Sequence, residues 1–238
     1  MAEPAVSRRE RARAATIAEI KEAALGLMAE SGATDVRFTD IARIMGMTPP
    51  AMYRYYADRD ELLEDLITDS YEHLGDSVAD ARDALDPDDI PGRWHAVAAA
   101  YRSWARKESH RFALIFGQPV PGFVASEDGP TTEAAKRAMS QLSALFVAAA
   151  HAGILEEPLV TEAPAAVAEC AHEKHPELDG IVPAESFQAM LQAWASLHGF
   201  VCLEAYGHLD WLGDEARDAL FRSHVAMIAR AAGIPAAG

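Results

Sequence analysis

FTDIARIMGMTPPAMYRYYA, residues 38–57, is the stretch that decides the fold of this chain. Its apolar residues recur at three- and four-residue spacing, which fits two short helices joined by a tight turn. Ala42 is small enough for two helices to cross closely, and Gly46 tolerates the positive φ of a turn because it has no Cβ. The stretch therefore predicts a helix-turn-helix.

The second helix of this unit has a marked beginning. Thr48 is an N-cap residue type, and Pro49 and Pro50 suit a first helical turn, where their missing N–H groups cost no intrahelical hydrogen bond. In a DNA-binding helix-turn-helix, the second helix enters the major groove with its N-terminal end. A helical hairpin without a role in DNA binding is the alternative, because Ala and Gly also occur at these positions by chance.

Basic residues surround this stretch, although the chain as a whole is acidic. The 238 residues carry a formal net charge of −16, which argues against a protein that binds nucleic acid over its whole surface. Residues 1–60, however, hold nine Lys or Arg against nine Asp or Glu, whereas the remainder holds 12 against 28. A basic N-terminal arm carries Arg8, Arg9, Arg11 and Arg13. The distribution predicts that only the N-terminal region contacts the phosphates or the minor groove of DNA.

Helical patterning extends over nearly the whole chain. A first amphipathic helix ends at Gly32, and a long helix begins with a capping box of Asp58 and Glu61 and continues towards Leu85. Further helices are expected near 94–108, 131–152, 164–173, 184–207 and 213–232, between segments rich in Pro and Gly. The sequence thus predicts an all-α protein of nine or ten helices. It consists of a three-helix N-terminal domain over 1–57 and a larger helical bundle over 58–238.

The sequence lacks the marks of secreted, membrane-bound and enzymatic proteins. Two cysteines are too few for a disulfide-stapled fold, and no apolar segment resembles a signal peptide or reaches the ~20 residues of a membrane span. No Gly-rich phosphate loop, G-x-S-x-G or CxxC motif occurs. His172, Glu173 and His175 lie close together, and Glu169 precedes His172 by three residues. A metal site in a helical bundle would need a second Glu-x-x-His pair, and the sequence has none. We expect a cytoplasmic protein without enzymatic activity, cofactor, metal or membrane partner.

The segment DIARIMGMTPPAMYRYYADRDELL, residues 40–63, resembles the DNA-binding domain of TetR-family transcriptional regulators. The family pattern reads IA…GVS…LYxHF…K-E-L and follows an amphipathic helix that ends in Gly, as Gly32 does here. The resemblance continues through most of the chain. Its C-terminal part is similar to the subgroup named WHG for a Trp-His-Gly element, which here comprises Trp194, His198 and Gly199.

The resemblance implies which residues contact DNA. Thr48 would cap the recognition helix and touch a phosphate, and the three residues after it would face base edges. Arg54 would bind either a base or a phosphate, and Arg59 a phosphate. Arg37 occupies a position often held by a capping Ser or Thr, so we expect the first short helix to be either capped by Thr39 or less well capped. The implied DNA-contacting residues are Arg8, Arg9, Arg11, Arg37, Thr39, Arg43, Thr48, Pro49, Pro50, Ala51, Tyr53, Arg54, Tyr55 and Arg59.

The resemblance also implies that the C-terminal domain binds a small molecule and dimerises. Large residues on several helices would either line a pocket or fill the core: Trp94, Tyr101, Trp104, Phe112, Phe116, Met139, Phe146, Trp194 and His198. The last two helices are apolar on more than one face, which favours a four-helix interface in a homodimer. The residues expected at this interface are Phe187, Leu191, Val201, Leu220, Phe221, Val225 and Ile228.

Together these features predict a ligand-responsive, sequence-specific DNA-binding regulator. As a repressor, its dimer would bind a palindromic operator in double-stranded DNA, and a small hydrophobic molecule would release it. A helical small-molecule-binding or scaffold protein without DNA activity is the alternative.

Overall fold

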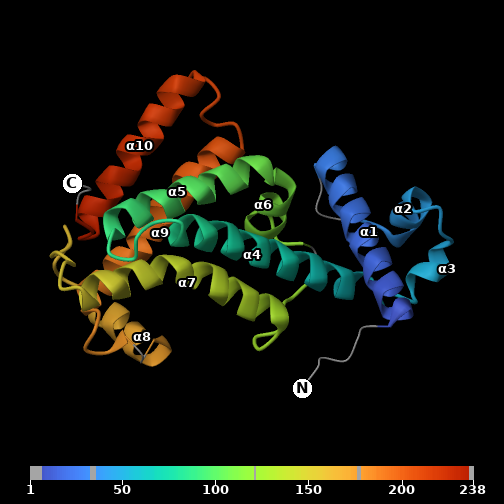
Figure 1. Cartoon of the computed structure of the whole chain (residues 1–238), viewed down its shortest axis with the longest axis horizontal. Coiled ribbons are helices and arrows are strands. Elements are labelled where there is room, and N and C mark those ends of the chain that lie inside the picture. The colour runs from blue at the N-terminus through green and yellow to red at the C-terminus, as the bar shows by residue number, and fades with distance from the viewer. Residues whose placement is uncertain (1–6, 33–35, 121, 176–177, 236–238) are drawn as a thin grey trace. The chain divides into compact units, whose positions relative to one another are not determined.

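The computed structural model describes residues 7–32, 36–120, 122–175 and 178–235, and within these ranges it contains ten α-helices and no strand (Figure 1). The helices are α1 (Arg8–Ser31), α2 (Phe38–Ile44), α3 (Pro49–Met52), α4 (Arg59–Asp83), α5 (Ile90–Lys107), α6 (Ser109–Phe116), α7 (Pro130–His151), α8 (Ala165–Lys174), α9 (Ala184–Ala205) and α10 (Asp214–Ala231). The all-α prediction is therefore confirmed. None of the described helices is long and apolar enough to cross a membrane.

Most helices lie within a few residues of their predicted positions, with two differences. The eight-residue helix α6 was not predicted, because only Glu108 separates it from α5 and no Pro or Gly marks the break. α5 begins earlier than predicted, at Ile90. Pro91 fits its first turn, where the N–H of Gly92 donates a 2.9 Å hydrogen bond to the carboxylate of Asp89.

The basic residues near the N-terminus are helical and do not form an arm. α1 begins at Arg8 because Ser7 and Glu10 form a capping box, in which each backbone N–H donates to the other's side chain, at 2.8 and 3.2 Å. The predicted arm is thus the first two turns of a helix that carries Arg8, Arg9, Arg11 and Arg13. At its other end α1 stops at Gly32, whose φ is 66°, as predicted.

The described residues form two compact units. Unit 1 comprises those up to Glu72 together with Glu108–Ala135, and unit 2 comprises His73–Lys107 together with those from Lys136 onward. Unit 1 is larger than the domain proposed for 1–57, because α6 packs against α1 and the first half of α4 belongs to the same core. α4 and α7 each contribute residues to both units.

The core of unit 1 holds the two short helices in place. It is formed by apolar side chains from α1 to α4 and from α6, and its completely buried members are Ile20, Ala24, Ile41, Ala42, Met52, Leu62, Leu63 and Leu66. Because close packing restricts movement, α1 and α4 act as a scaffold that fixes the surface presented by α2 and α3.

In unit 2, α5 packs against α9 and α10. Trp94 of α5 is completely buried, and its indole N–H donates a 3.1 Å hydrogen bond to the carbonyl of Val225 in α10. Arg102 of α5 binds Glu204 of α9 through two 2.6 Å contacts, and both side chains are buried. These polar contacts fix three helices around one core, because each buried group needs its partner.

Candidate nucleic-acid interface

The turn between α2 and α3 has the geometry of a helix-turn-helix. Gly46 has a φ of 63°, and the N–H of Met47 donates a 2.8 Å hydrogen bond to the carbonyl of Ala42. Ala42 is completely buried, so a larger side chain would force neighbouring helices apart. The helix-turn-helix predicted from residues 38–57 is confirmed.

α3 is a single turn, and no side chain caps it. Pro49 and Pro50 occupy its first turn, as predicted. Thr48 stands at the N-cap position, but its hydroxyl makes no capping hydrogen bond. The prediction that its side chain caps the helix is wrong, because the two prolines have no N–H to offer. The first available N–H, that of Ala51, donates to the carbonyl of Thr48 at 2.8 Å.

α2 likewise begins without a side-chain cap. Arg37 stands at its N-cap position and Thr39 lies inside the helix, so capping by Thr39 is wrong and the other alternative, a less well capped helix, is confirmed. The N–H groups of Asp40 and Ile41 donate instead to the carbonyl of Arg37, at 3.0 and 3.2 Å.

The residues implied to contact DNA all reach the surface of unit 1. Ala51, Tyr55 and Arg59 are half-buried, and the exposed ones are Arg8, Arg9, Arg11, Arg37, Thr39, Arg43, Thr48, Pro49, Pro50, Tyr53 and Arg54. Tyr53 is 62 % exposed, and its ring packs edge-on against Phe38. The first turn of α3 is therefore accessible to a DNA groove.

Two of the arginines have acidic neighbours. A guanidinium nitrogen of Arg43 lies 3.0 Å from Asp40, and one of Arg59 lies 3.5 Å from Asp60. Such exposed pairs contribute only about 0–1 kcal/mol, so either guanidinium can exchange its carboxylate for a phosphate at small cost.

Arg13 positions the recognition helix. Its guanidinium donates to the backbone carbonyls of Arg54 at 2.6 Å and Tyr55 at 3.4 Å, and it lies 5.4 Å from the centre of the Tyr55 ring. These contacts tie α1 to the residues that follow α3. Arg13 is exposed, but its guanidinium is engaged with these protein groups.

A polar network joins the same segment to α4. The hydroxyl of Tyr56 donates a 2.6 Å hydrogen bond to Asp65, and Nζ of Lys21 lies 2.8 Å from Asp65 and 2.7 Å from Asp69. Burial and the Asp65 carboxylate raise the pKa of Tyr56 well above its usual value, so its hydroxyl remains a donor. Burial acts to lower the pKa of Lys21, but hydrogen bonds to the two carboxylates outweigh it and raise this pKa overall.

Sequence reasoning missed this network, although one signal was available. Tyr56 stands where the family pattern LYxHF has Phe, and a hydroxyl added to a buried ring requires a partner. Its partner is nine residues further on, and Lys21 lies 44 residues from Asp65, so no local pattern connects them.

The beginning of α4 contains half of the predicted capping box. The carboxylate of Asp58 accepts a 2.9 Å hydrogen bond from the N–H of Glu61. The carboxylate of Glu61 accepts from the N–H of Ala57 instead of that of Asp58. The two residues still satisfy donors at the helix start, which fixes the junction between helix-turn-helix and α4.

The residues expected to line a ligand pocket are divided between the two units. Phe112 and Phe116 lie on α6 in unit 1, with their ring centres 5.3 Å apart. Within unit 2, Met139, Trp194 and His198 are half-buried. Those that are at most 3 % exposed, and therefore fill its core, are Trp94, Tyr101, Trp104 and Phe146.

His198 is a hydrogen-bonded histidine within unit 2. Its Nδ1 lies 2.6 Å from the hydroxyl of Tyr101, its Nε2 lies 3.3 Å from Sγ of Cys202, and its ring stacks on Trp194. Burial lowers the pKa of the imidazole. This environment matches the core alternative for His198 rather than the ligand contact.

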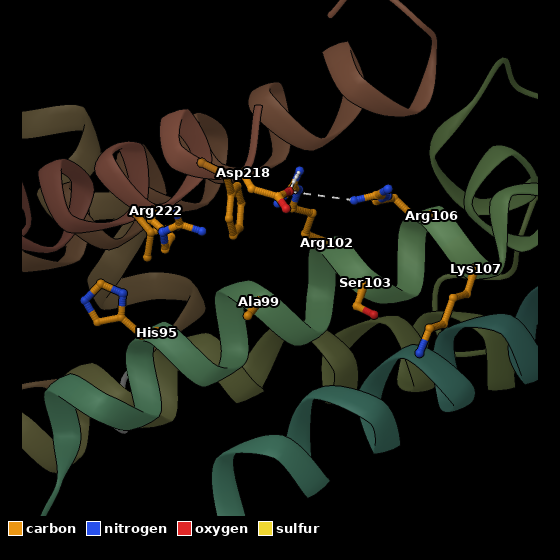
Figure 2. Close-up of a pocket in the computed structure, with 10 residues that line it drawn as sticks. His95, Ala99, Arg102, Ser103, Arg106, Lys107, Asp218 and Arg222 are labelled. Carbon is orange, nitrogen blue, oxygen red and sulfur yellow. Dashed lines mark ion pairs between the residues drawn. The ribbon is translucent and has the colours of Figure 1, made fainter. Parts of the chain in front are cut away.

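A groove of about 800 Å³ lies between α5 and α10 in unit 2 (Figure 2). None of the nine expected pocket residues is among those that line it. Its basic lining residues, which sequence reasoning missed, are Arg102, Arg106, Lys107 and Arg222. The available signal was a set of cations on two helices of an otherwise acidic region.

Most residues expected at a dimer interface are covered by their own chain. The buried ones, which belong to the core of unit 2, are Phe187, Val201, Phe221, Val225 and Ile228. Leu191 of α9 and Leu220 of α10 remain 48 % and 46 % exposed. Leu203 and Met227, on the same helices, are about as exposed.

Two family models match the chain. The model described as bacterial regulatory proteins, tetR family, matches residues 20–66, which include α2 and α3 with parts of α1 and α4. The model described as tetracyclin repressor-like, C-terminal domain, matches residues 94–228, which extend from α5 into α10.

Curated relatives resemble part of the chain. The HTH-type transcriptional regulators Rv1816 of Mycobacterium tuberculosis and Mb1846 of Mycobacterium bovis are each 40 % identical to it over 123 residues, 52 % of this chain and 53 % of either relative. The chain therefore spans about half the length of the curated relatives it matches.

Solved structures resemble nearly all of the chain. The regulatory protein SCO4313 is 33 % identical, with 93 % of this chain and 98 % of that one covered and a TM-score of 0.72. PfmR of Thermus thermophilus, a TetR family transcriptional regulator, shares the fold at 15 % identity, with coverage of 88 % and 96 % and a TM-score of 0.56. Since the C-terminal family model alone matches more than half of its residues, the chain belongs to the TetR family of bacterial transcriptional regulators.

Proposed function

We propose that the protein is a homodimeric repressor that binds a palindromic operator in double-stranded DNA and leaves it when a small hydrophobic molecule binds. The observation that carries the DNA-binding part is the exposed first turn of α3, with Arg43, Arg54 and Arg59 near it in the chain. The turn is fixed from behind by Arg13 and Tyr56. A surface held in this way binds DNA without first ordering itself.

The composition of α3 indicates how the operator is read. Pro49, Pro50 and Ala51 offer no side-chain donors for paired hydrogen bonds to a base. Arg54 is exposed and supplies the nearest guanidinium. Sequence preference would therefore depend on Arg54, on apolar contacts of α3 with thymine methyl groups, and on the shape of the DNA.

The apolar residues left exposed on α9 and α10 support a dimer. Leu191, Leu203, Leu220 and Met227 are each between 46 % and 50 % exposed. Burial of these side chains against the same helices of a second copy would remove them from water. The interface would use this outer face and not the buried residues expected from the sequence.

Release from DNA would follow from a change in the spacing of two DNA-binding surfaces. A twofold dimer binds half-sites separated by ~34–36 Å or a multiple of it. α4 is continuous from the helix-turn-helix junction into unit 2, so a ligand bound in unit 2 can favour a spacing of the two DNA-binding surfaces that no longer fits the half-sites.

The narrower assignment to the WHG subgroup is part of this proposal, and the stacking of Trp194 on His198 supports it.

The test is binding to DNA from upstream of the protein's own coding region, measured at several salt concentrations. Arg59→Ala should reduce the slope of log K against log salt by about one unit, because one phosphate contact is lost. Arg137→Ala, which removes a half-exposed arginine from α7 outside this surface, should keep the wild-type slope. Absence of binding at low salt contradicts the proposal and favours the helical scaffold alternative.

A further inference from the structure

The groove between α5 and α10 has an apolar floor. Ala99 of α5 and Phe221 and Val225 of α10 supply it, and the volume of about 800 Å³ is large enough for a small organic molecule. Figure 2 shows these helices side by side, with His95, Arg102, Arg106, Asp218 and Arg222 between them.

The ends of the groove are basic. Figure 2 shows Arg106 towards one end, and His95 and Arg222 towards the other. Unit 2 contains 19 Asp or Glu against 11 Lys or Arg, yet four of these 11 cations line this groove. Asp218 is the one acidic residue among those that line it. The groove is therefore a positive site in a negative region, which attracts anions.

Asp218 is held chiefly by an inner arginine and interacts more weakly with Arg106 and Arg222, so one carboxylate is shared among several cations. Arg102 lies 2.8 Å from Asp218, binds Glu204 in a bidentate manner, and covers the ring of Phe221 at 4.6 Å. Arg102 also lowers the pKa of Asp218, so this carboxyl group stays ionised and engaged. Arg106 is 3.9 Å from both carboxylates, too far for a hydrogen bond.

Arg222 is different from the other arginines of the groove. Among the residues that the structure describes, it has no carboxylate at ion-pair distance, and its side chain is exposed. Figure 2 shows Arg222 and His95 at the same end of the groove. A guanidinium presents parallel N–H groups that match the two oxygens of a carboxylate.

We propose that this groove binds an organic carboxylate with an apolar body. Arg222 holds the carboxylate, and the body lies on Ala99, Phe221 and Val225. The proposal that the effector binds in this groove rests on the proposed regulatory function. The proposal that an organic anion binds there does not.

The first test is calorimetry of the full chain without DNA, with octanoate and its neutral counterpart octanol as probes. Octanoate should bind saturably and about tenfold or more tightly than octanol, because only the anion makes charge-assisted hydrogen bonds. Arg222→Ala should weaken octanoate binding about tenfold or more. Arg230→Ala removes the same charge from an exposed position of α10 outside the groove and should change the affinity less than about twofold.

Several outcomes overturn the proposal. The proposal is contradicted if octanoate does not bind saturably or if octanol binds as tightly as octanoate. It is also contradicted if Arg222→Ala and Arg230→Ala weaken octanoate binding equally. Inorganic phosphate bound as tightly as octanoate would overturn the role of the apolar floor. Thermal unfolding of both variants at the wild-type temperature excludes misfolding as the cause, and NMR signals of the His95 imidazole should shift with octanoate only in chains that retain Arg222.

A separate measurement addresses the role in regulation. Octanoate should weaken DNA binding by the wild type and not by Arg222→Ala. Octanoate binding without an effect on DNA contradicts the effector role and leaves the anion site intact. Absence of DNA binding altogether contradicts the proposed function and leaves the calorimetric test of the groove unaffected.

Discussion

The hydroxyl of Tyr56 lies 2.6 Å from a carboxylate oxygen of Asp65, and this bond joins the end of the helix-turn-helix to α4. The same carboxylate accepts a hydrogen bond from Lys21 of α1. Three segments of unit 1 therefore meet at one acidic side chain. A Phe in place of Tyr56 would fill the same space without this hydrogen bond. The hydroxyl therefore serves to orient the segment, whereas the ring fills the core.

Tyr56→Phe tests this role. The ring stays buried, but Asp65 loses a hydrogen bond, so the free energy of unfolding should fall by about 0.5–1.5 kcal/mol. Affinity for DNA should fall as well, because the residues after α3 lose one of their anchors. Urea unfolding and DNA titration measure the two effects.

The matched control is Tyr53→Phe, three residues earlier. Tyr53 is 62 % exposed and no partner of its hydroxyl is found among the described residues, so its removal should leave unfolding unchanged within about 0.5 kcal/mol. Equal losses of stability in the two variants would show that the bond to Asp65 does not stabilise the fold.

Gly46 and Gly26, two of the glycines with open space around them, should respond in opposite directions to replacement by alanine. A Cβ at Gly46 or at Gly26 would meet no atom within 4 Å. Gly46 has a φ of 63°, so Gly46→Ala should destabilise the fold by about 1–2 kcal/mol through backbone strain alone. Gly26 lies inside α1, where Gly26→Ala should add about 0.5–1 kcal/mol. Denaturant titration of both variants checks the signs, and stabilisation by Gly46→Ala would contradict this account of the turn.

Local chemistry explains why much of this region was predictable. Gly32 and Gly46 adopt the positive φ expected of them, and Pro49 and Pro50 occupy the turn that tolerates them. Each of these features depends on neighbours within a few residues. The wrong prediction that Thr48 caps α3 also has a local cause. A capping hydroxyl needs an N–H two or three residues further along the chain, and the prolines remove the nearer N–H groups.

Features that depend on distant residues could not be read from the sequence. Large apolar residues at helical spacing fit a core and a pocket equally well, and the burial of Trp94 and Phe146 is decided by helices far along the chain. The groove requires α5 and α10 to lie together, more than 100 residues apart, before Arg222 can face Ala99. The spacing of apolar residues within a helix does not encode this contact between α5 and α10.

The exposed face of α9 and α10 yields a test of the dimer. Leu191→Glu places a charge at a position that is 48 % exposed in the single chain, so it should disturb an interface more than the monomer. We expect light scattering at micromolar concentration to give half the wild-type mass. Leu159→Glu, at a 78 % exposed position outside these helices, should keep the wild-type mass. A wild-type protein that is already monomeric would contradict the dimer.

His198 should make stability depend on pH below neutrality. Burial lowers its pKa in the folded chain, whereas the unfolded chain keeps a value near ~6.5. As the pH falls through this value, the unfolded chain binds a proton that the folded chain does not, so the free energy of unfolding decreases towards acid. His198→Gln removes the titrating group. The variant should be less stable than the wild type at pH 8, because the bond to Tyr101 is weakened, yet it should lose less stability between pH 7.5 and 5.5.

Urea unfolding at a series of pH values measures this difference in slope. His151→Gln, which changes an exposed histidine at the end of α7, is the control and should retain the wild-type slope. The comparison of slopes separates the proton from the lost hydrogen bond, because the bond to Tyr101 shifts stability at every pH above the histidine's titration. If wild type and His198→Gln change in parallel between pH 7.5 and 5.5, the imidazole takes up its proton equally in both states, and its hydrogen bond to Tyr101 does not depend on the neutral form.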